Sequence, residues 1–240
     1  MKKIDIIILS NTANEHFHNL LSITVNSIKA QTDIESNIIL VETNKEYKTK
    51  EQYNLPIDIL VVPDELFHFN KFLNYGLKYS TADFVCFSNN DVKYHAHSLY
   101  HLVEAMQSYD SVSPHGLGYG PHLNTDSVID HCQLNASFLG WCFCFTRKTL
   151  NECFGGNFDE RFAFYRQDDD IVRTLAFRKL RHALVGPAKV EHLNLMGYAG
   201  RGANSYGLFG SKEQTYHYTE SPEQMHILND KWNKIYKGQS

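Results

Sequence analysis

Short runs of β-branched and other apolar residues alternate with stretches of helical period over the first 110 residues of the chain. The apolar runs are residues 4–9, 37–41, 58–62 and 83–87, and the helical stretches are residues 17–30, 69–79 and 98–106. Strands that are buried on both faces read as continuous apolar runs, and two parallel strands are usually joined by a helix. The order therefore predicts an α/β fold with a mixed, mainly parallel sheet flanked by helices.

The pattern is less regular after residue 110. A cluster of prolines and glycines predicts a loop that could carry an acceptor-binding surface, and it comprises Pro114, Gly116, Gly118, Gly120 and Pro121. Strand, helix and strand patterns then follow over residues 139–146, 169–181 and 183–192. Five glycines within residues 197–210 predict a mobile segment. Residues 221–237 have the pattern of an amphipathic helix, which we expect to pack against the core; a membrane-surface or partner-binding helix is the alternative.

The size and charge of the chain limit the classes of function. A chain of 240 residues is most simply one domain, and a formal net charge of −4 does not provide the basic footprint of most nucleic-acid-binding proteins. Five scattered cysteines are an odd number, which fits reduced thiols in the cytoplasm better than a disulfide framework. The apolar run at residues 4–9 is too short for a signal peptide or a membrane span. We therefore expect a cytoplasmic protein without a transmembrane segment.

A group of polar side chains follows the strand at residues 83–87. Ser88, Asn89, Asn90 and Asp91 come directly after the apolar run. A carboxylate at the carboxyl end of a strand can bind a hard cation such as Mg²⁺ or Mn²⁺, while its neighbours contact a ribose or a phosphate. The alternative is a polar turn with no ligand.

Three adjacent aspartates, Asp168, Asp169 and Asp170, precede an apolar helical pattern. Acidic residues are stabilised in the first turn of a helix by its dipole, and this could be their whole role. The functional alternative is that the loop places one carboxylate in the cleft of the sheet, where it deprotonates a hydroxyl group of an acceptor.

These two segments, with four others, resemble the inverting family 2 glycosyltransferases, which have the Rossmann-like GT-A fold. The resemblance covers roughly residues 4 to 195. Its motifs, in chain order, are Ser10-Asn11 after the first strand, Glu42-Thr43-Asn44 after the second, the helix start at residues 69–77, the element at residues 88–92, the strand and glycine-rich turn at residues 140–162, and Gln167-Asp168-Asp169-Asp170.

The resemblance implies a role for each matching residue. Asp91 and His192 would bind a divalent metal, Mn²⁺ or Mg²⁺, and Asp168 would be the general base. Contacts to the nucleotide-sugar would come from Ser10, Asn11, Glu42, Lys71, Asn74, Asn89, Asn90, Trp141 and Asp170. Residues 1–110 would form the nucleotide-binding half, residues 111–200 the acceptor and catalytic half, and residues 201–240 a mobile loop and a C-terminal helix.

The implied activity is the metal-dependent, inverting transfer of a sugar from a nucleotide-diphosphate sugar, preferably a UDP-sugar, to a hydroxyl group of a glycan or lipid-linked glycan. Three positions depart from the family pattern, because Asn44, Asn89 and Gln167 replace acidic residues. A non-catalytic sugar- or nucleotide-binding protein is therefore one alternative, and Asp169 and Asp170 stay candidates for the base. The richness in Asn, Ile, Lys and Tyr suggests a second alternative, a phage enzyme that glycosylates hydroxymethylated DNA.

The other metal-binding residue types do not form a recognisable zinc motif. His95, His97 and His101 lack the glutamate of a zinc-protease helix, and no two cysteines have the Cys-x-x-Cys spacing. We therefore expect structural roles for both groups.

Overall fold

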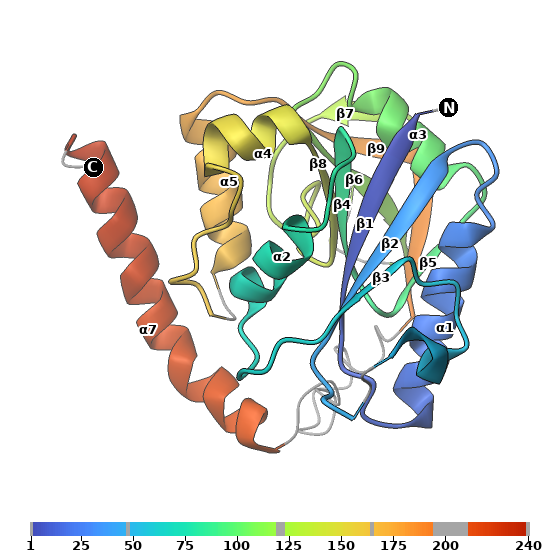
Figure 1. The fold of residues 1–240 in the computed structure, drawn as a ribbon. Coiled ribbons are helices and arrows are strands. Elements are labelled where there is room, and N and C mark those ends of the chain that lie inside the picture. The colour runs from blue at the N-terminus through green and yellow to red at the C-terminus, as the bar shows by residue number, and fades with distance from the viewer. Residues whose placement is uncertain (1, 47–48, 119–122, 164–165, 194–210, 239–240) are drawn as a thin grey trace.

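The computed structural model describes residues 2–46, 49–118, 123–163, 166–193 and 211–238, with only the backbone for residues 211–221. Its nine strands form one sheet (Figure 1). They are β1 (Lys3–Ser10), β2 (Glu35–Glu42), β3 (Ile59–Val61), β4 (Phe84–Asn89), β5 (Val92–Tyr94), β6 (Ser111–Leu117), β7 (Val128–Asp130), β8 (Cys142–Thr146) and β9 (His182–His192). The order across the sheet is β3-β2-β1-β4-β8-β6-β9-β5, and β7 pairs with β9.

The sheet is mixed, as the sequence predicts. Strands β3, β2, β1 and β4 are parallel, and β6 is parallel to β9. Antiparallel pairs join β4 to β8, β8 to β6, β9 to β5 and β9 to β7. The parallel part is the region in which strand and helix patterns alternate regularly in the sequence.

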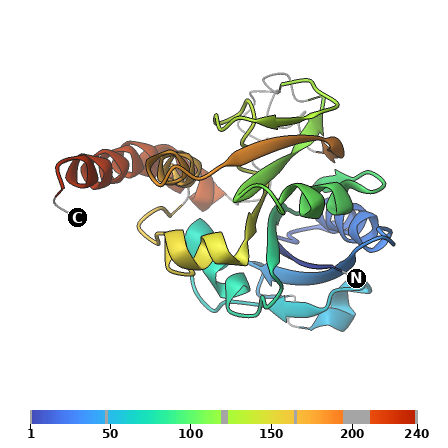
Figure 2. The same ribbon diagram turned by 90° about the horizontal axis from the view of Figure 1, so that it is seen from above.

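Helices cover both faces of this sheet (Figures 1 and 2). They are α1 (Glu15–Lys29), α2 (Phe69–Leu77), α3 (Ser98–Ala105), α4 (Arg147–Phe154), α5 (Gln167–Phe177) and α7 (Ser211–Tyr236), with a short 3₁₀ helix η1 (Lys50–Tyr53). Side chains of a strand alternate between the two faces. Ile6 of β1 accordingly joins the core beneath α1 and α3, whereas Ile7 joins the core beneath α2, α4 and α5.

The prediction of a loop at residues 114–121 is wrong for residues 114–117, which belong to β6. Pro114 and Gly116 lie within β6, whose pairing with β9 shifts in register between Pro114 and His115. Proline has no N–H to donate and is tolerated in a sheet at such irregularities. Gly118 has a φ of 73° and follows the strand, while Gly120 and Pro121 lie outside the described residues.

The other differences concern element boundaries and short elements. The sequence pattern did not indicate β5, β7 or α4, and the strand expected from residue 139 begins at Cys142. The helix expected over residues 169–181 begins earlier and ends at Phe177, because Lys179 has a φ of 55°. The C-terminal helix is present and packs against the protein through Leu228 and Trp232. The expected mobile segment at residues 197–210 lies outside the described residues.

Candidate active site

The carboxyl ends of the central parallel strands bring the first group of expected site residues together. Ser10 of β1 is in register with Glu42 of β2, and Leu9, next to Ser10, is in register with Asn89 of β4. In open α/β sheets, ligands bind at this edge. Ser10 Oγ also accepts a hydrogen bond from Asn90 Nδ2 at 3.2 Å, which links the end of β1 to the turn after β4.

Glu42 is a fully buried carboxylate that is held by four donors. Its Oε1 accepts from the backbone N–H of Thr12 at 3.0 Å and of Asn44 at 2.7 Å. Its Oε2 accepts from the hydroxyl groups of Thr12 at 2.7 Å and Tyr53 at 2.9 Å. A buried carboxylate needs such donors to offset its lost hydration. Glu42 therefore shapes the loop that follows β1, in which Asn11 lies.

Asp91 and His192 face each other beside this edge. Val92 of β5 is in register with His192 of β9, so the antiparallel pairing places His192 Nε2 3.3 Å from Asp91 Oδ1. Asn89 Nδ2 lies 3.5 Å from the same imidazole nitrogen. Burial raises the pKa of Asp91, although the nearby imidazole opposes this, and burial lowers the pKa of His192, although Asp91 opposes it. The low pKa favours a neutral imidazole, which is the form that binds metals.

This pair fits the divalent metal that the sequence resemblance implies. Within the described residues, Asp91 Oδ1 and His192 Nδ1 are buried and make no hydrogen bond, although Asp91 Oδ1 lies 3.3 Å from the other imidazole nitrogen, Nε2. Carboxylates suit Mg²⁺ and Mn²⁺, and neutral imidazole suits transition metals, so the two donors together are compatible with Mn²⁺. The described part of the chain contains no cluster of three or more His, Cys, Asp or Glu residues that could hold a metal. Oxygen atoms of a nucleotide diphosphate would therefore have to complete the coordination.

Asp168 lies in the first turn of α5, and its carboxyl group packs directly on the backbone of Gly140. A Cβ atom at Gly140 would lie 2.1 Å from Asp168 Oδ2, so only glycine leaves room for this contact. Among the described residues, Asp168 Oδ1 is buried and has no hydrogen-bond partner. Burial, together with the negative charge of Asp169, raises the pKa of Asp168 to about 7. Asp168 can therefore exchange a proton near neutral pH.

The two following aspartates have different surroundings. Asp169 Oδ2 lies 3.3 Å from Arg166 Nη1. Both carboxylate oxygens of Asp170 face α7, where they contact Lys231 at 2.7 Å and accept a hydrogen bond from Trp232 at 2.9 Å. Of the three acids, Asp168 is the one for which the described residues provide no cationic partner.

The turn at Gly140 and Trp141 connects Asp168 to the Asp91–His192 pair. Gly140 packs on Asp168, and the Trp141 ring lies 4.8 Å from the His192 ring, measured between centroids. The carbonyl oxygen of Trp141 accepts a hydrogen bond from the N–H of Asn89 at 2.9 Å. Gly140 thus contacts Asp168, and the adjacent Trp141 contacts His192 and Asn89. The sequence pattern points to Trp141 but not to the role of Gly140, whose only signal is its place directly before Trp141 and β8.

Asn74 and Lys71, both on α2, have partners within the protein. Asn74 accepts a hydrogen bond from the N–H of Phe158 at 2.8 Å and donates to its carbonyl oxygen at 2.9 Å, so it braces the glycine-rich turn before α5. Lys71 forms an ion pair with Glu65, and its side chain is one third exposed.

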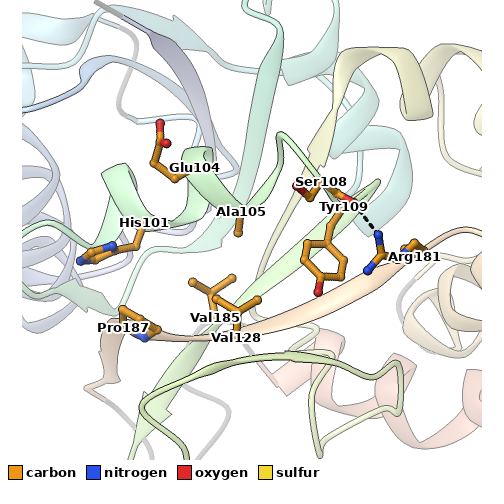
Figure 3. Close-up of a pocket in the computed structure, with 9 residues that line it drawn as sticks. All are labelled: His101, Glu104, Ala105, Ser108, Tyr109, Val128, Arg181, Val185 and Pro187. Carbon is orange, nitrogen blue, oxygen red and sulfur yellow. Dashed lines mark hydrogen bonds between the residues drawn. The ribbon is translucent and has the colours of Figure 1, made fainter.

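A surface hollow of about 550 Å³ lies elsewhere, between α3, β7 and β9. Figure 3 shows Val128, Val185 and Pro187 on one side of it and His101 and Glu104 on the other. None of the expected site residues lines this hollow.

This architecture, a parallel sheet with polar strand ends joined to an antiparallel part, is the GT-A fold of glycosyltransferases. The sequence model of "Glycosyl transferase family 2" matches residues 7–168, which is more than half of the chain. The chain therefore belongs to glycosyltransferase family 2. The match ends at Asp168.

Two solved structures with the same fold are distant from this chain in sequence. TarS from S. aureus, residues 1–349, is 15% identical, with a TM-score of 0.60, and the alignment covers 81% of this chain and 61% of TarS. GalNAc-T7, solved with UDP, GalNAc and Mn²⁺, is 11% identical, with a TM-score of 0.61, and the alignment covers 79% of this chain and 43% of GalNAc-T7. The chain thus spans less than two thirds of either protein. No curated protein matches the sequence.

Among the described residues, no helix has both the length and the apolar character needed to cross a membrane.

Proposed function

We propose that this family 2 glycosyltransferase moves a sugar from a nucleotide-diphosphate sugar to a hydroxyl group, with Asp168 as the general base. The observation that supports this role best is the environment of Asp168, a buried carboxyl group without a cationic partner among the described residues. A general base is most effective when its pKa lies near the working pH, and the pKa of Asp168 is raised to about 7. Asp169 and Asp170 are engaged by Arg166 and by α7.

In the proposed reaction, Asp168 accepts the proton of the acceptor hydroxyl as its oxygen attacks the anomeric carbon of the donor sugar. A new bond forms between this carbon and the acceptor oxygen, while the bond to the diphosphate oxygen breaks and its electron pair leaves with the nucleotide diphosphate. Attack from the face opposite the leaving group inverts the anomeric configuration. We propose that the sugar ring stacks on Trp141, whose ring centroid lies 4.8 Å from that of His192.

Asp91 and His192 are the residues that would hold a divalent metal. When bound, Mn²⁺ or Mg²⁺ supplies positive charge that stabilises the diphosphate leaving group. UDP and Mn²⁺ are present in the structure of GalNAc-T7, and this supports UDP-sugars and Mn²⁺ as the first choices for this chain. We propose that Ser10, Asn11 and Asn90, which lie at or just after the ends of β1 and β4, contact the nucleotide.

A glycan or lipid-linked glycan is the acceptor class that we propose. These acceptors need no basic surface, whereas a DNA acceptor would normally require one, and the formal net charge of the chain is −4.

The test is a panel of nucleotide-sugars, with and without Mn²⁺, in which donor binding and slow donor hydrolysis are measured. We expect Asp168→Asn to bind the donor but to lose about 10²- to 10⁴-fold in hydrolysis, which is the usual contribution of a general base. Asp169→Asn is the matched control, because it removes the neighbouring acid and should keep most of the activity. Donor binding without turnover in the wild-type protein would instead support the non-catalytic alternative.

A further inference from the structure

The C-terminal helix α7 contacts the segment that carries Asp168 through two polar side chains. Lys231 Nζ lies 2.7 Å from Asp170 Oδ2 and 2.9 Å from Asp159 Oδ2, and Trp232 Nε1 donates to Asp170 Oδ1 at 2.9 Å. The side chain of Asp170 is only 6% exposed. Loss of one partner would leave a buried charge poorly compensated, so these contacts strongly constrain the first turn of α5.

Apolar packing holds α7 at the same place. Trp232 is 2% exposed and forms a small core with Phe162 and Leu228, and its ring lies 5.9 Å from the ring of Phe177 on α5. Gln224 accepts a hydrogen bond from the N–H of Ala163 at 2.8 Å. The helix therefore contacts both α5 and the segment that precedes it, and Figures 1 and 2 show α7 beside α5.

The start of α5 needs such support because it has no side-chain cap. Arg166, at the N-cap position, has a φ of 67° and makes no capping hydrogen bond with its side chain. A residue other than glycine is strained in this left-handed region, and such a conformation persists only where the surroundings fix it. On the opposite side, Asp168 packs on Gly140. Asp170 and α7 supply a constraint that the local sequence does not provide.

We propose that Lys231 and Trp232 are positioning residues for the catalytic base. By clamping Asp170, they hold the first turn of α5 so that Asp168 stays against Gly140, oriented toward the acceptor hydroxyl. This inference rests on the proposed function and extends it to a helix that lies beyond the family match at residues 7–168. A helix that only stabilised the fold would change the melting temperature but not the kcat of folded molecules.

The test uses the full chain and four variants. Lys231→Met removes the charge, Lys231→Arg keeps it, and Trp232→Phe removes the indole N–H but keeps an aromatic ring. Lys234→Met is the matched control, because Lys234 lies on the same helix and its ion pair with Asp230 is exposed. Donor affinity, kcat and KM for hydrolysis, and thermal unfolding are measured for each protein.

We expect Lys231→Met and Trp232→Phe to bind the donor normally and to lose about 10- to 100-fold in kcat, which is the scale of a misplacement of about 1 Å. Lys231→Arg should recover most of the loss, and Lys234→Met should match the wild type. Folded Lys231→Met and Trp232→Phe proteins with wild-type kcat would overturn the inference. If Lys231→Met fails to fold, the kcat of the milder Trp232→Phe variant provides the same test. Full activity in Asp168→Asn would instead refute the proposed role of Asp168 as the general base.

Discussion

Gly140→Ala tests the contact between the turn before β8 and Asp168. The added Cβ would lie 2.1 Å from Asp168 Oδ2 and 2.5 Å from Cγ, whereas ordinary van der Waals contact begins at 3.4 Å. The carboxyl group or the turn must therefore move by more than 1 Å, and a misplacement of about 1 Å at a reacting group can cost about 100-fold in rate. Overpacking of this kind destabilises a protein by about 1–3 kcal/mol.

The assay compares kcat and KM for donor hydrolysis with the free energy of unfolding in urea. Gly76→Ala is the control, because its Cβ would lie 2.5 Å from Ile7 Cγ2 in the core beneath α2. We expect both variants to lose stability, but only Gly140→Ala to lose kcat in the folded protein. Wild-type kcat in a folded Gly140→Ala protein would show that the position of Asp168 against Gly140 does not matter for the reaction.

Three further outcomes follow from the buried acids. The pKa of Asp168 is raised from 3.8 to about 7, so the contribution of its protonated form to stability is fully present below pH 3.8 and is lost as the pH rises through 7. The free energy of unfolding in urea should therefore fall for the wild type, relative to Asp168→Asn, between pH 5 and pH 8. Asp91→Ala should abolish the effect of Mn²⁺ on donor affinity in calorimetric titrations, and an unchanged Mn²⁺ effect would remove Asp91 from the metal site. Glu42→Gln places an amide among four donors and should cost about 1–3 kcal/mol in urea unfolding, with circular dichroism as the check that the fold is retained.

The sequence predicts the parallel part of the fold well because its signals are local. The apolar run at residues 4–9 lies within β1, and the polar residues Ser10 and Asn89 mark strand ends that lie next to each other. Parallel strands bring their carboxyl ends to one edge, so the position of these residues follows from the strand pattern alone. Pro114 shows the limit, because a register shift between two distant strands admits a residue that locally favours a loop.

The site itself depends on contacts that no local pattern contains. Asp168, Asp169 and Asp170 are identical neighbours in the sequence, and only their partners distinguish them: Gly140, Arg166, and Lys231 with Trp232. Some of these partners lie far away in the chain, so the sequence left the choice of base open. The resemblance placed Asp91 and His192 together, and the pairing of β5 with β9 places them 3.3 Å apart.

Lys231 and Trp232, which contact Asp170, lie near the C-terminal end of the described residues, and this affects the order in which contacts can form during synthesis. Lys231 and Trp232 follow Asp170 by 61 and 62 residues, and the N-terminal segments of a protein are synthesised first. The strands that carry Ser10, Glu42 and Asn89 can pair before these residues emerge. In a nascent chain, the strand ends at Ser10, Glu42 and Asn89 would therefore be made before Lys231 and Trp232 can contact Asp170.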